Sequence, residues 1–184
     1  SYAAVYETEQ QPGYNWLHES FSTNWRMTEI QGVIGRIQLA QMSDWIAKRS
    51  ANAQAILGAC SKWEEKGYLS APKLEQASQF PNSNHAYYKL YVYVRPNNLA
   101  KGWTRDRLIE EISALGVPCY SGSASEVYLE KAFDDTGLRP ANRLPIAKQL
   151  GETSLMFLVH PTLTAAEIAQ TVDAIDRVFG SMIK

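Results

Sequence analysis

Residues 22–31 read STNWRMTEIQ and run directly into a helical pattern that extends over residues 32–55. Thr28 is followed three residues later by Gln31, a spacing typical of a capping box, in which each side chain accepts a backbone N–H of the other residue. Such a box satisfies N–H groups that the start of a helix otherwise leaves without partners. The sequence therefore predicts a helix that begins immediately after Thr28.

Polar side chains that could bind an anion lie just before this predicted helix. Asn24 offers an amide, and Arg26 offers a planar guanidinium that suits two parallel hydrogen bonds to a phosphate or a carboxylate. Met27 precedes the capping threonine, and we expect it to pack on a residue one turn into the helix and so to fix the entry angle of the chain. Asn24 and Arg26 are therefore expected to be well positioned.

Two consecutive helices are predicted over residues 28–60. The apolar stripe of the first helix changes phase between Gln41 and Asp44, where we expect a break or a bend. Ser43 is a favourable N-cap for the second helix. The first helix has more apolar surface than one core face needs, and its glycines permit another backbone to approach. Its apolar positions are Ile30, Val33, Ile34 and Ile37.

The remainder of the chain predicts a small sheet covered by helices. Residues 61–84 read as a polar connection with one short strand. Further strands are expected over residues 87–94, 117–120 and 154–159, and helices over residues 104–116, 125–133, 145–151 and from Thr164 onward. Thr164 with Glu167 forms a second capping box. Short strands and long connections favour an α/β or α+β fold, with mixed or antiparallel pairing rather than a doubly wound sheet.

The composition excludes several classes of function. Of the 184 residues 45% are hydrophobic, enough for a core, and 18 basic against 19 acidic residues leave a formal charge of −1. The basic surface that binds nucleic acid is therefore not expected. No apolar run is long enough for a membrane span and no signal peptide is recognisable, so a cytoplasmic location is expected. Cys60 and Cys119 are interpreted as reduced thiols, with an oxidised pair as the alternative.

Few residues stand out as candidates for chemistry on their own. The three histidines are scattered, and no cluster has the spacing of a zinc site, so no metal is expected. Residues 121–125 read Ser-Gly-Ser-Ala-Ser, which is the nearest approach to a phosphate-binding loop. The alternative is an ordinary turn with an N-cap serine. Cys119 could act as a nucleophile, although no histidine is near it in sequence.

A family resemblance rests on the stretch that opens the first helix. Residues 24–31 are followed by Ile-Gly at 34–35, Gln-Leu at 38–39 and Lys-Arg-Ser-Ala-Asn-Ala at 48–53. This succession resembles the DegT/DnrJ/StrS family of pyridoxal-phosphate-dependent sugar aminotransferases. Its members share Asn-x-Arg-Met-(Thr/Ser)-(Glu/Asp)-(Leu/Ile)-Gln, then Ala-x-x-Gly-x-x-Gln-Leu, then an Arg-rich helix. The match is specific because fixed residue types recur at fixed spacing.

The resemblance implies the C-terminal part of a fold-type I aminotransferase. Residues 1–27 would be a remnant of the large domain with the cofactor and substrate loop, residues 28–60 the connecting and interface helices, and residues 61–184 the C-terminal small domain. The family's Ser-Phe-x-x-x-Lys stretch, which anchors the cofactor, is missing, and none of the lysines matches it. We therefore expect no catalytic residue in this chain, no retained pyridoxal phosphate, and no transamination by the chain alone.

The resemblance also implies roles for individual residues. Asn24 would hydrogen-bond the cofactor phosphate of the neighbouring subunit in a homodimer. Arg26 matches a position that meets the substrate in members acting on acidic nucleotide sugars, and otherwise braces the loop. Tyr120 and Ser121 lie where many members have a His-Tyr or His-Trp pair, then Pro and Leu, lining the partner's pocket. Because this chain departs from that pattern, we expect a different sugar or a non-standard subgroup.

The reaction implied for the intact protein is ping-pong transamination. An amino donor, usually glutamate, would load the cofactor, and the amino group would then pass to a keto-sugar carried on a nucleotide, for cell-surface polysaccharide or related sugar biosynthesis. Two alternatives belong to other classes. One is a non-catalytic binding or regulatory module that reuses the small domain. The other is a structural dimerisation piece, for which the apolar first helix is the evidence.

Overall fold

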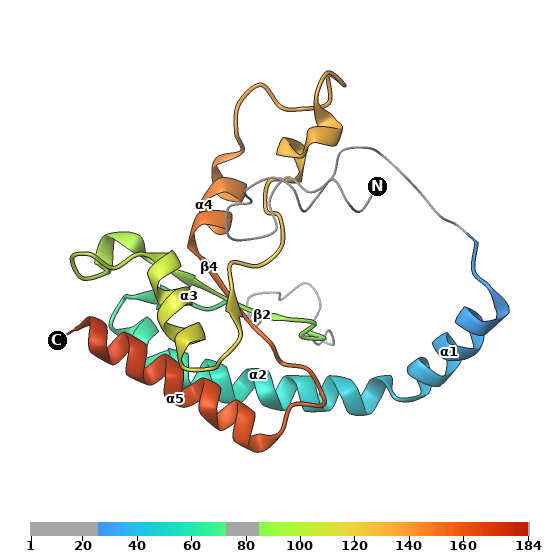
Figure 1. Ribbon diagram of the computed structural model, residues 1–184, viewed down its shortest axis with the longest axis horizontal. Coiled ribbons are helices and arrows are strands. Elements are labelled where there is room, and N and C mark those ends of the chain that lie inside the picture. Colours follow the sequence, from blue (N-terminus) through green and yellow to red (C-terminus); the bar gives the residue numbers. More distant parts are fainter. Residues whose placement is uncertain (1–25, 73–84, 184) are drawn as a thin grey trace, which may run out of the picture.

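A four-stranded antiparallel sheet forms the centre of the computed structural model, which describes residues 26–72 and 85–183. The strands are β1 (Leu69–Ser70), β2 (Leu90–Val94), β3 (Cys119–Tyr120) and β4 (Ser154–Phe157). They pair in the order β1-β2-β4-β3, so that the last strand in sequence lies between β2 and β3 (Figure 1). The predicted small antiparallel sheet within a mixed α/β chain is confirmed.

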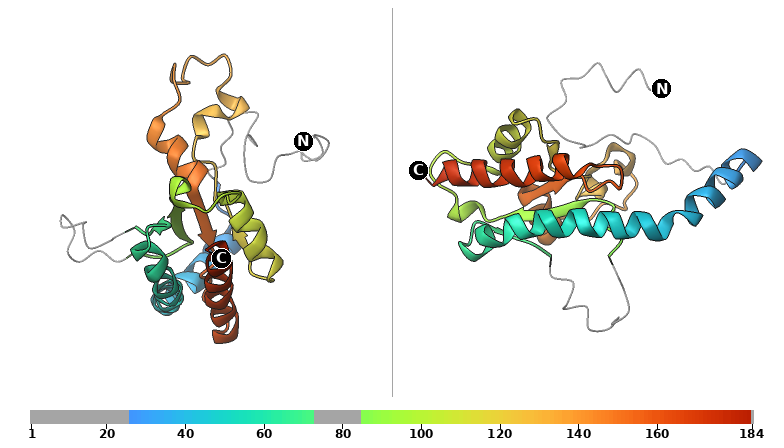
Figure 2. Two further views of the ribbon diagram at one scale, coloured as in Figure 1. Left: turned by 90° about the vertical axis from the view of Figure 1, so that its left-hand side faces the viewer. Right: turned by 90° about the horizontal axis from the view of Figure 1, so that it is seen from below.

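Helices cover one face of this sheet. They are α2 (Met42–Glu65), α3 (Arg105–Ala114) and α5 (Ala165–Met182). Figure 2 shows α2 and α5 running side by side along the sheet, where they pack on each other. Val92 and Phe157 of the sheet are fully buried in the same core as Ile56 of α2 and Ile175 of α5. Burying such side chains supplies the main favourable term of folding.

The other face of the sheet is more open. Tyr91 of β2 pairs in register with Met156 of β4, which pairs in turn with Tyr120 of β3, so these three side chains share the face opposite the helices. After β3 the chain leaves the sheet and returns to it only at β4. Figure 1 shows this excursion standing above the sheet, with α4 (Pro145–Thr153) at its end. It also contains the short 3-10 helices η4 (Val127–Leu129) and η5 (Lys131–Phe133).

Both predicted capping boxes are confirmed. At the start of α1 (Glu29–Ala40), the Thr28 N–H donates to Gln31 Oε1 at 2.8 Å and the Gln31 N–H donates to Thr28 Oγ1 at 3.3 Å. At the start of α5, the Thr164 N–H donates to Glu167 Oε2 at 2.7 Å. These hydrogen bonds from Thr164 lower the pKa of Glu167. The starts of both helices are therefore set by local sequence.

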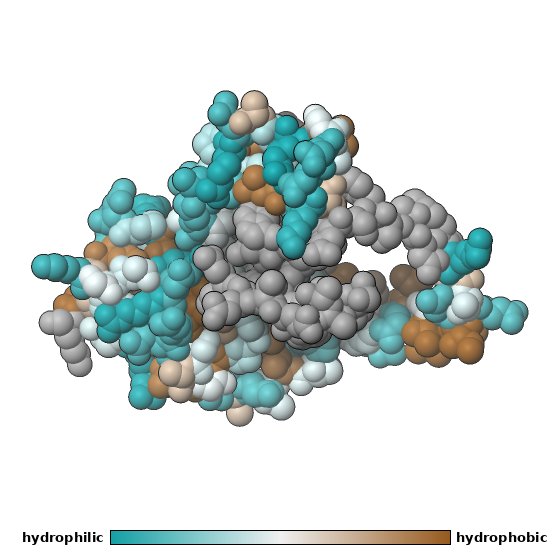
Figure 3. All heavy atoms as spheres, turned by 45° about the horizontal axis from the view of Figure 1, so that its top comes forward, coloured by the Kyte–Doolittle hydropathy of each residue, from teal (hydrophilic) through white to brown (hydrophobic). Residues whose placement is uncertain are grey.

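Helix α1 projects away from the sheet and exposes its apolar side chains. No residue of α1 is buried. Figures 1 and 2 show α1 as an arm beyond the start of α2, and Figure 3 shows hydrophobic surface on it. The exposed side chains include Met27 (76% exposed), Ile30 (73%), Val33 (58%), Ile34 (51%) and Ile37 (54%). At 76% exposure Met27 is not buried against the first turn of α1, so the expectation that it packs there is wrong.

Several predicted boundaries are wrong in ways that have local causes. Ser43 is not an N-cap, because α2 already begins at Met42 and the αR residue Gln41 links it to α1 without a side-chain cap. The strand predicted from residue 87 begins at Leu90, because Tyr87 has a positive φ of 44° and its N–H donates to His85 Nδ1. A helix was expected over residues 125–133, where the structure has the two 3-10 turns instead.

Two further helix ends differ from the prediction. Gly151 does not end α4, which continues to Thr153, because Gly151 keeps a helical backbone and Ser125 packs directly against it. Helix α5 buries Ile168, Ile175 and Phe179 as predicted, whereas Val172 is only partly buried. No helix in the described ranges is both long and apolar enough to cross a membrane.

The two capping boxes allow a matched comparison of how much α5 and α1 each contribute to the stability of the fold. Replacing Thr164 by alanine should lower the free energy of unfolding by about 1 kcal/mol, because an N-cap contributes roughly that amount and α5 carries much of the core. The same change at Thr28 should fray α1 and leave the main unfolding transition in place, since α1 buries no residue. Urea denaturation followed by circular dichroism measures both. Equal losses for T164A and T28A would contradict this account.

Candidate functional site

Two of the predicted substrate contacts, Tyr120 and Ser121, lie where β3 ends and the loop over residues 121–125 begins. Tyr120, the last residue of β3, is 44% exposed on the open face of the sheet. Ser121 is half-buried, and its carbonyl accepts a hydrogen bond of 2.5 Å from Ser154 Oγ at the start of β4. The structure therefore places Tyr120 and Ser121 together, with the phenol exposed and the serine backbone fixed to the central strand.

A hollow of about 420 Å³ lies between this loop, α4 and the open face of the sheet. Its lining combines serines and tyrosines with apolar side chains of α4. It includes Tyr91, Ser123, Ser125, Ile146, Leu150 and Ser154. Its polar side chains are the hydroxyl groups of serines and tyrosines, and none of the lining side chains has a formal charge. Such a lining suits a ligand with hydrogen-bonding groups.

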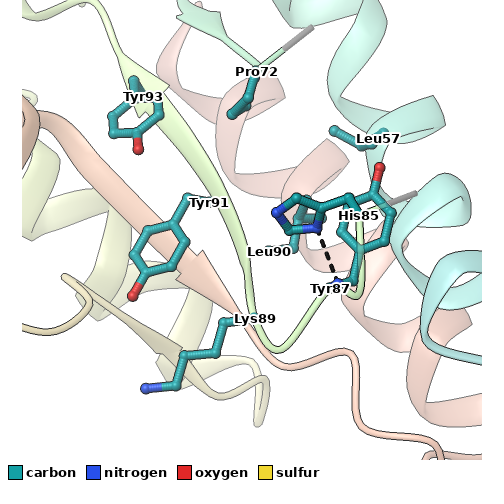
Figure 4. Close-up of a pocket in the computed structure, with 8 residues that line it drawn as sticks. All are labelled: Leu57, Pro72, His85, Tyr87, Lys89, Leu90, Tyr91 and Tyr93. Carbon is teal, nitrogen blue, oxygen red and sulfur yellow. Dashed lines mark hydrogen bonds between the residues drawn. The ribbon is translucent and has the colours of Figure 1, made fainter. Parts of the chain in front are cut away.

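A smaller hollow of about 160 Å³ lies on the side of the sheet toward β1. Figure 4 shows that Lys89, Tyr91 and Tyr93 point to the same side of β2, with His85 and Tyr87 at the edge of the strand. Burial and the neighbouring Tyr91 raise the pKa of Tyr93. Because phenol and ammonium groups both donate hydrogen bonds, this side of β2 presents donors.

A buried carboxylate anchors the chain directly after the loop. Glu126 is 5% exposed, and both of its oxygens accept from the guanidinium of Arg143, with the Nε contact at 2.9 Å. The Tyr128 hydroxyl also donates to Glu126 Oε1, at 2.5 Å, and accepts the Leu144 N–H at 2.8 Å. The hydrogen bonds from Arg143 lower the pKa of Glu126. Glu126 is therefore ionised at neutral pH and fastens residues 126–128 to residues 143–144.

Arg26, another predicted site residue, lies just before α1 and away from the loop over residues 121–125. Arg26 is exposed and comes two residues before the cap of α1. Asn24 lies outside the described residues. Figures 1 and 2 both show α1 as an arm that projects away from the sheet and from α4. Within one chain the structure does not bring the start of α1 to the loop that follows Tyr120.

The two cysteines are free and buried. Burial raises the pKa of both Cys60 and Cys119 to about 12. Because the thiolate is the reactive form, a thiol held protonated at neutral pH does not favour Cys119 as a nucleophile. Within residues 26–72 and 85–183 no three His, Cys, Asp or Glu side chains come together as metal ligands.

Sequence reasoning missed the residues that hold the loop. Tyr91 was assigned to a strand, and the alternation of that strand could have placed it on the face opposite Leu90 and Val92. The contact between Glu126 and Arg143 spans 17 positions of irregular chain, and no periodic pattern predicts such a pair. Only the spatial arrangement shows that these side chains support residues 121–125.

The Glu126 anchor predicts a defined pH dependence. Replacing Glu126 by glutamine should lower the free energy of unfolding at pH 7 by about 1–3 kcal/mol, because a buried charge-assisted pair is lost. The folded pKa of Glu126 lies below its ordinary value of 4.5, so the stabilisation is present above that pH and disappears as the pH falls through the folded pKa. The difference between E126Q and the wild type should therefore shrink in acid, as measured by urea denaturation at pH 7 and pH 4.

Glu152 provides the control for that measurement. It is 57% exposed and lies 3.8 Å from the same guanidinium. Replacing it by glutamine should change the free energy of unfolding by less than about 0.5 kcal/mol, as is usual for exposed ion pairs. An E152Q effect as large as that of E126Q would contradict the anchoring role of the buried carboxylate.

Known proteins similar to this chain are aminotransferases and their relatives. The erythromycin biosynthesis sensory transduction protein EryC1 from Saccharopolyspora erythraea is 27% identical over 149 residues, which cover 81% of this chain and 36% of that protein. A dTDP-3-amino-3,4,6-trideoxy-alpha-D-glucose transaminase from Streptomyces venezuelae is 24% identical, over 87% of this chain and 38% of that protein. The chain thus spans well under half of either relative.

A solved structure and a family model agree with these relatives. The X-ray structure of the aminotransferase from Psychrobacter cryohalolentis is 73% identical, with a TM-score of 0.83, and the match covers all of this chain and 47% of that one. The model of the DegT/DnrJ/EryC1/StrS aminotransferase family matches residues 5–176, including the loop, the sheet and most of α5. The chain therefore belongs to the DegT/DnrJ/EryC1/StrS aminotransferase family.

Proposed function

We propose that this chain is part of a sugar aminotransferase that moves an amino group from glutamate to a keto-sugar carried on a nucleotide. The observation that carries the proposal is the family match over residues 5–176. Enzymes of this family depend on pyridoxal phosphate. The Streptomyces venezuelae relative, whose name is that of a transaminase of a dTDP-linked amino sugar, supports a nucleotide sugar as the substrate class.

The chain would supply the C-terminal part of that enzyme. Residues 1–27 would belong to the large domain, residues 28–60 to the connecting and interface helices, and residues 61–184 to the small domain. The chain spans 36% to 38% of the curated relatives, which agrees with its being one part of a longer enzyme. The cofactor, when bound, would serve as the electron sink for moving the amino group.

The residues present fit only part of a cofactor site. None of the lysines follows the family's Ser-Phe-x-x-x-Lys pattern. Among the described lysines Lys89 alone is half-buried, and it lines the smaller hollow beside β2. Asn24 would donate to the cofactor phosphate, and Arg26 would meet an acidic group of the substrate or brace the loop. The anchoring lysine and the partner of the ring nitrogen would come from other parts of the protein.

The site would be completed by a second subunit. Arg26 precedes α1, while Tyr120 ends β3 and Ser121 begins the loop that follows it, so one chain offers these groups in separate places. The exposed apolar side chains of α1, at helical spacing, offer a surface for the homodimer that would bring them together. A non-catalytic dimerisation module is the second candidate, and the same exposed face of α1 favours it.

The proposed function predicts where the cofactor binds. The natively isolated full-length gene product should absorb in the visible range through bound pyridoxal phosphate, and adding glutamate should abolish that band. The 184-residue chain alone should show no such band after incubation with pyridoxal phosphate, because the anchoring lysine would lie outside it. Borohydride reduction followed by peptide mass analysis should find no modified lysine in the chain. Pyridoxal phosphate reduced onto any lysine of this chain would contradict the proposal that the anchoring lysine lies outside it.

The proposed homodimer predicts a role for the apolar face of α1. Replacing Ile34 by glutamate in the full-length gene product should raise the dimer dissociation constant at least about tenfold, because burying an unpaired carboxylate costs more than the roughly 1.4 kcal/mol that corresponds to that factor. Ile183, which follows α5, is 47% exposed and lines no hollow described above, so it provides a matched control for Ile34. Analytical ultracentrifugation should show I183E as a dimer like the wild type. A dimeric I34E protein would remove α1 from the interface.

A further inference from the structure

The backbone of the loop over residues 121–125 is shaped by one tyrosine ring. Gly122 is buried and has a φ of 94°, a conformation that side chains with a Cβ rarely adopt. A Cβ at this position would lie 2.4 Å from Cε1 and 3.1 Å from Oη of Tyr91. The loop can therefore lie on the Tyr91 ring only because residue 122 is glycine.

The neighbouring residues add polar contacts to the same ring. The Ser123 N–H donates to Tyr91 Oη over 3.5 Å, and Ser123 Oγ lies 3.4 Å from that oxygen. Both are long hydrogen bonds, so they orient the loop weakly and the packing of Gly122 on the ring is the stronger constraint. Tyr91 itself is held in β2, which is paired with β4 on one side and β1 on the other. The loop thus takes its position from the sheet.

The ends of the loop are fixed as well. Ser154 Oγ donates to the Ser121 carbonyl, and Ser125 fits so closely over Gly151 of α4 that a Cβ there would lie 2.0 Å from Ser125 Oγ. Glu126 follows at once, with its carboxylate held by Arg143. The loop is therefore fastened from its first residue to its last, while Ser123 and Ser125 stay exposed.

We propose that Gly122 and Tyr91 are positioning residues that hold the loop over residues 121–125 in the shape that recognises the phosphate-bearing part of the nucleotide sugar. This inference rests on the proposed function. The loop is rich in serine hydroxyls, which can donate to phosphate oxygens. A loop whose shape is set before binding loses little conformational entropy when the ligand arrives. Gly122 and Tyr91 act through the loop and need not touch the substrate.

The test uses the full-length gene product and nucleoside diphosphates as probes. Calorimetry with dTDP, GDP and UDP identifies the nucleoside diphosphate that the wild-type protein binds most tightly. The variant G122A should bind that nucleotide at least about tenfold more weakly, because the added methyl group forces the loop off the Tyr91 ring. The loss of the visible absorption band on adding glutamate should proceed at the wild-type rate in G122A. A general structural defect would slow that half-reaction too.

Gly137 provides the control for backbone strain. It has a φ of 72°, and a Cβ there would have no atom within 4 Å. G137A therefore carries a similar conformational cost without a clash, and its affinity for the probe should match the wild type. A second control places G122A in a Tyr91→Ala background, where the added methyl group meets no ring. The effect of G122A should be several-fold smaller there, because the two residues act through one contact.

The outcomes separate this inference from the proposed function. A wild-type protein without a glutamate-sensitive band would overturn the proposed function and the inference with it. A normal glutamate response together with unchanged affinity in G122A would overturn the inference alone. Equal losses in G122A and G137A, or an effect of G122A that Tyr91→Ala does not reduce, would also count against it, since the contact with the ring would then have no role.

Discussion

The central strand β4 is buried along its whole length, and the other elements take their places from it. Its alternate residues Leu155 and Phe157 are fully buried in the core beneath α2 and α5. Its other residues, Ser154 and Met156, face the opposite side and are also buried. β2 and β3 pair with the two edges of β4. This pairing brings Tyr91 of β2 and the loop that follows β3 onto the same face of the sheet. The candidate site is a consequence of that pairing.

The open face and the arm divide the candidate site between two parts of the molecule. The sheet holds Tyr120 and the loop rigidly, through Ser154, Gly122 and the buried Glu126. The arm carries Arg26 and an apolar face whose side chains are more than half exposed. An apolar surface of this kind is typical of an interface. Under the proposed function, each subunit would give a rigid loop to one site and a cationic side chain to another.

The fold was largely predictable from local patterns. Capping boxes set the starts of α1 and α5, the β-branched and aromatic residues of positions 87–94 indicated β2, and the apolar run at residues 154–159 indicated the buried strand β4. These features depend on neighbours in sequence. The errors arose where a single contact overrode the local preference. Tyr87, with its positive φ, delays the start of β2, and Ser125 packed on Gly151 accompanies the extension of α4.

The sequence by itself determined the family and the starts of α1 and α5, because these depend on motifs and on spacings of a few residues. The tertiary structure decided the rest. Strand order, the row formed by Tyr91, Met156 and Tyr120, and the ion pair of Glu126 with Arg143 join residues far apart in the chain. Such contacts form only when the burial of the core fixes the register of the strands, and no local pattern encodes that register. Only the folded chain therefore shows which side chains hold the loop in place.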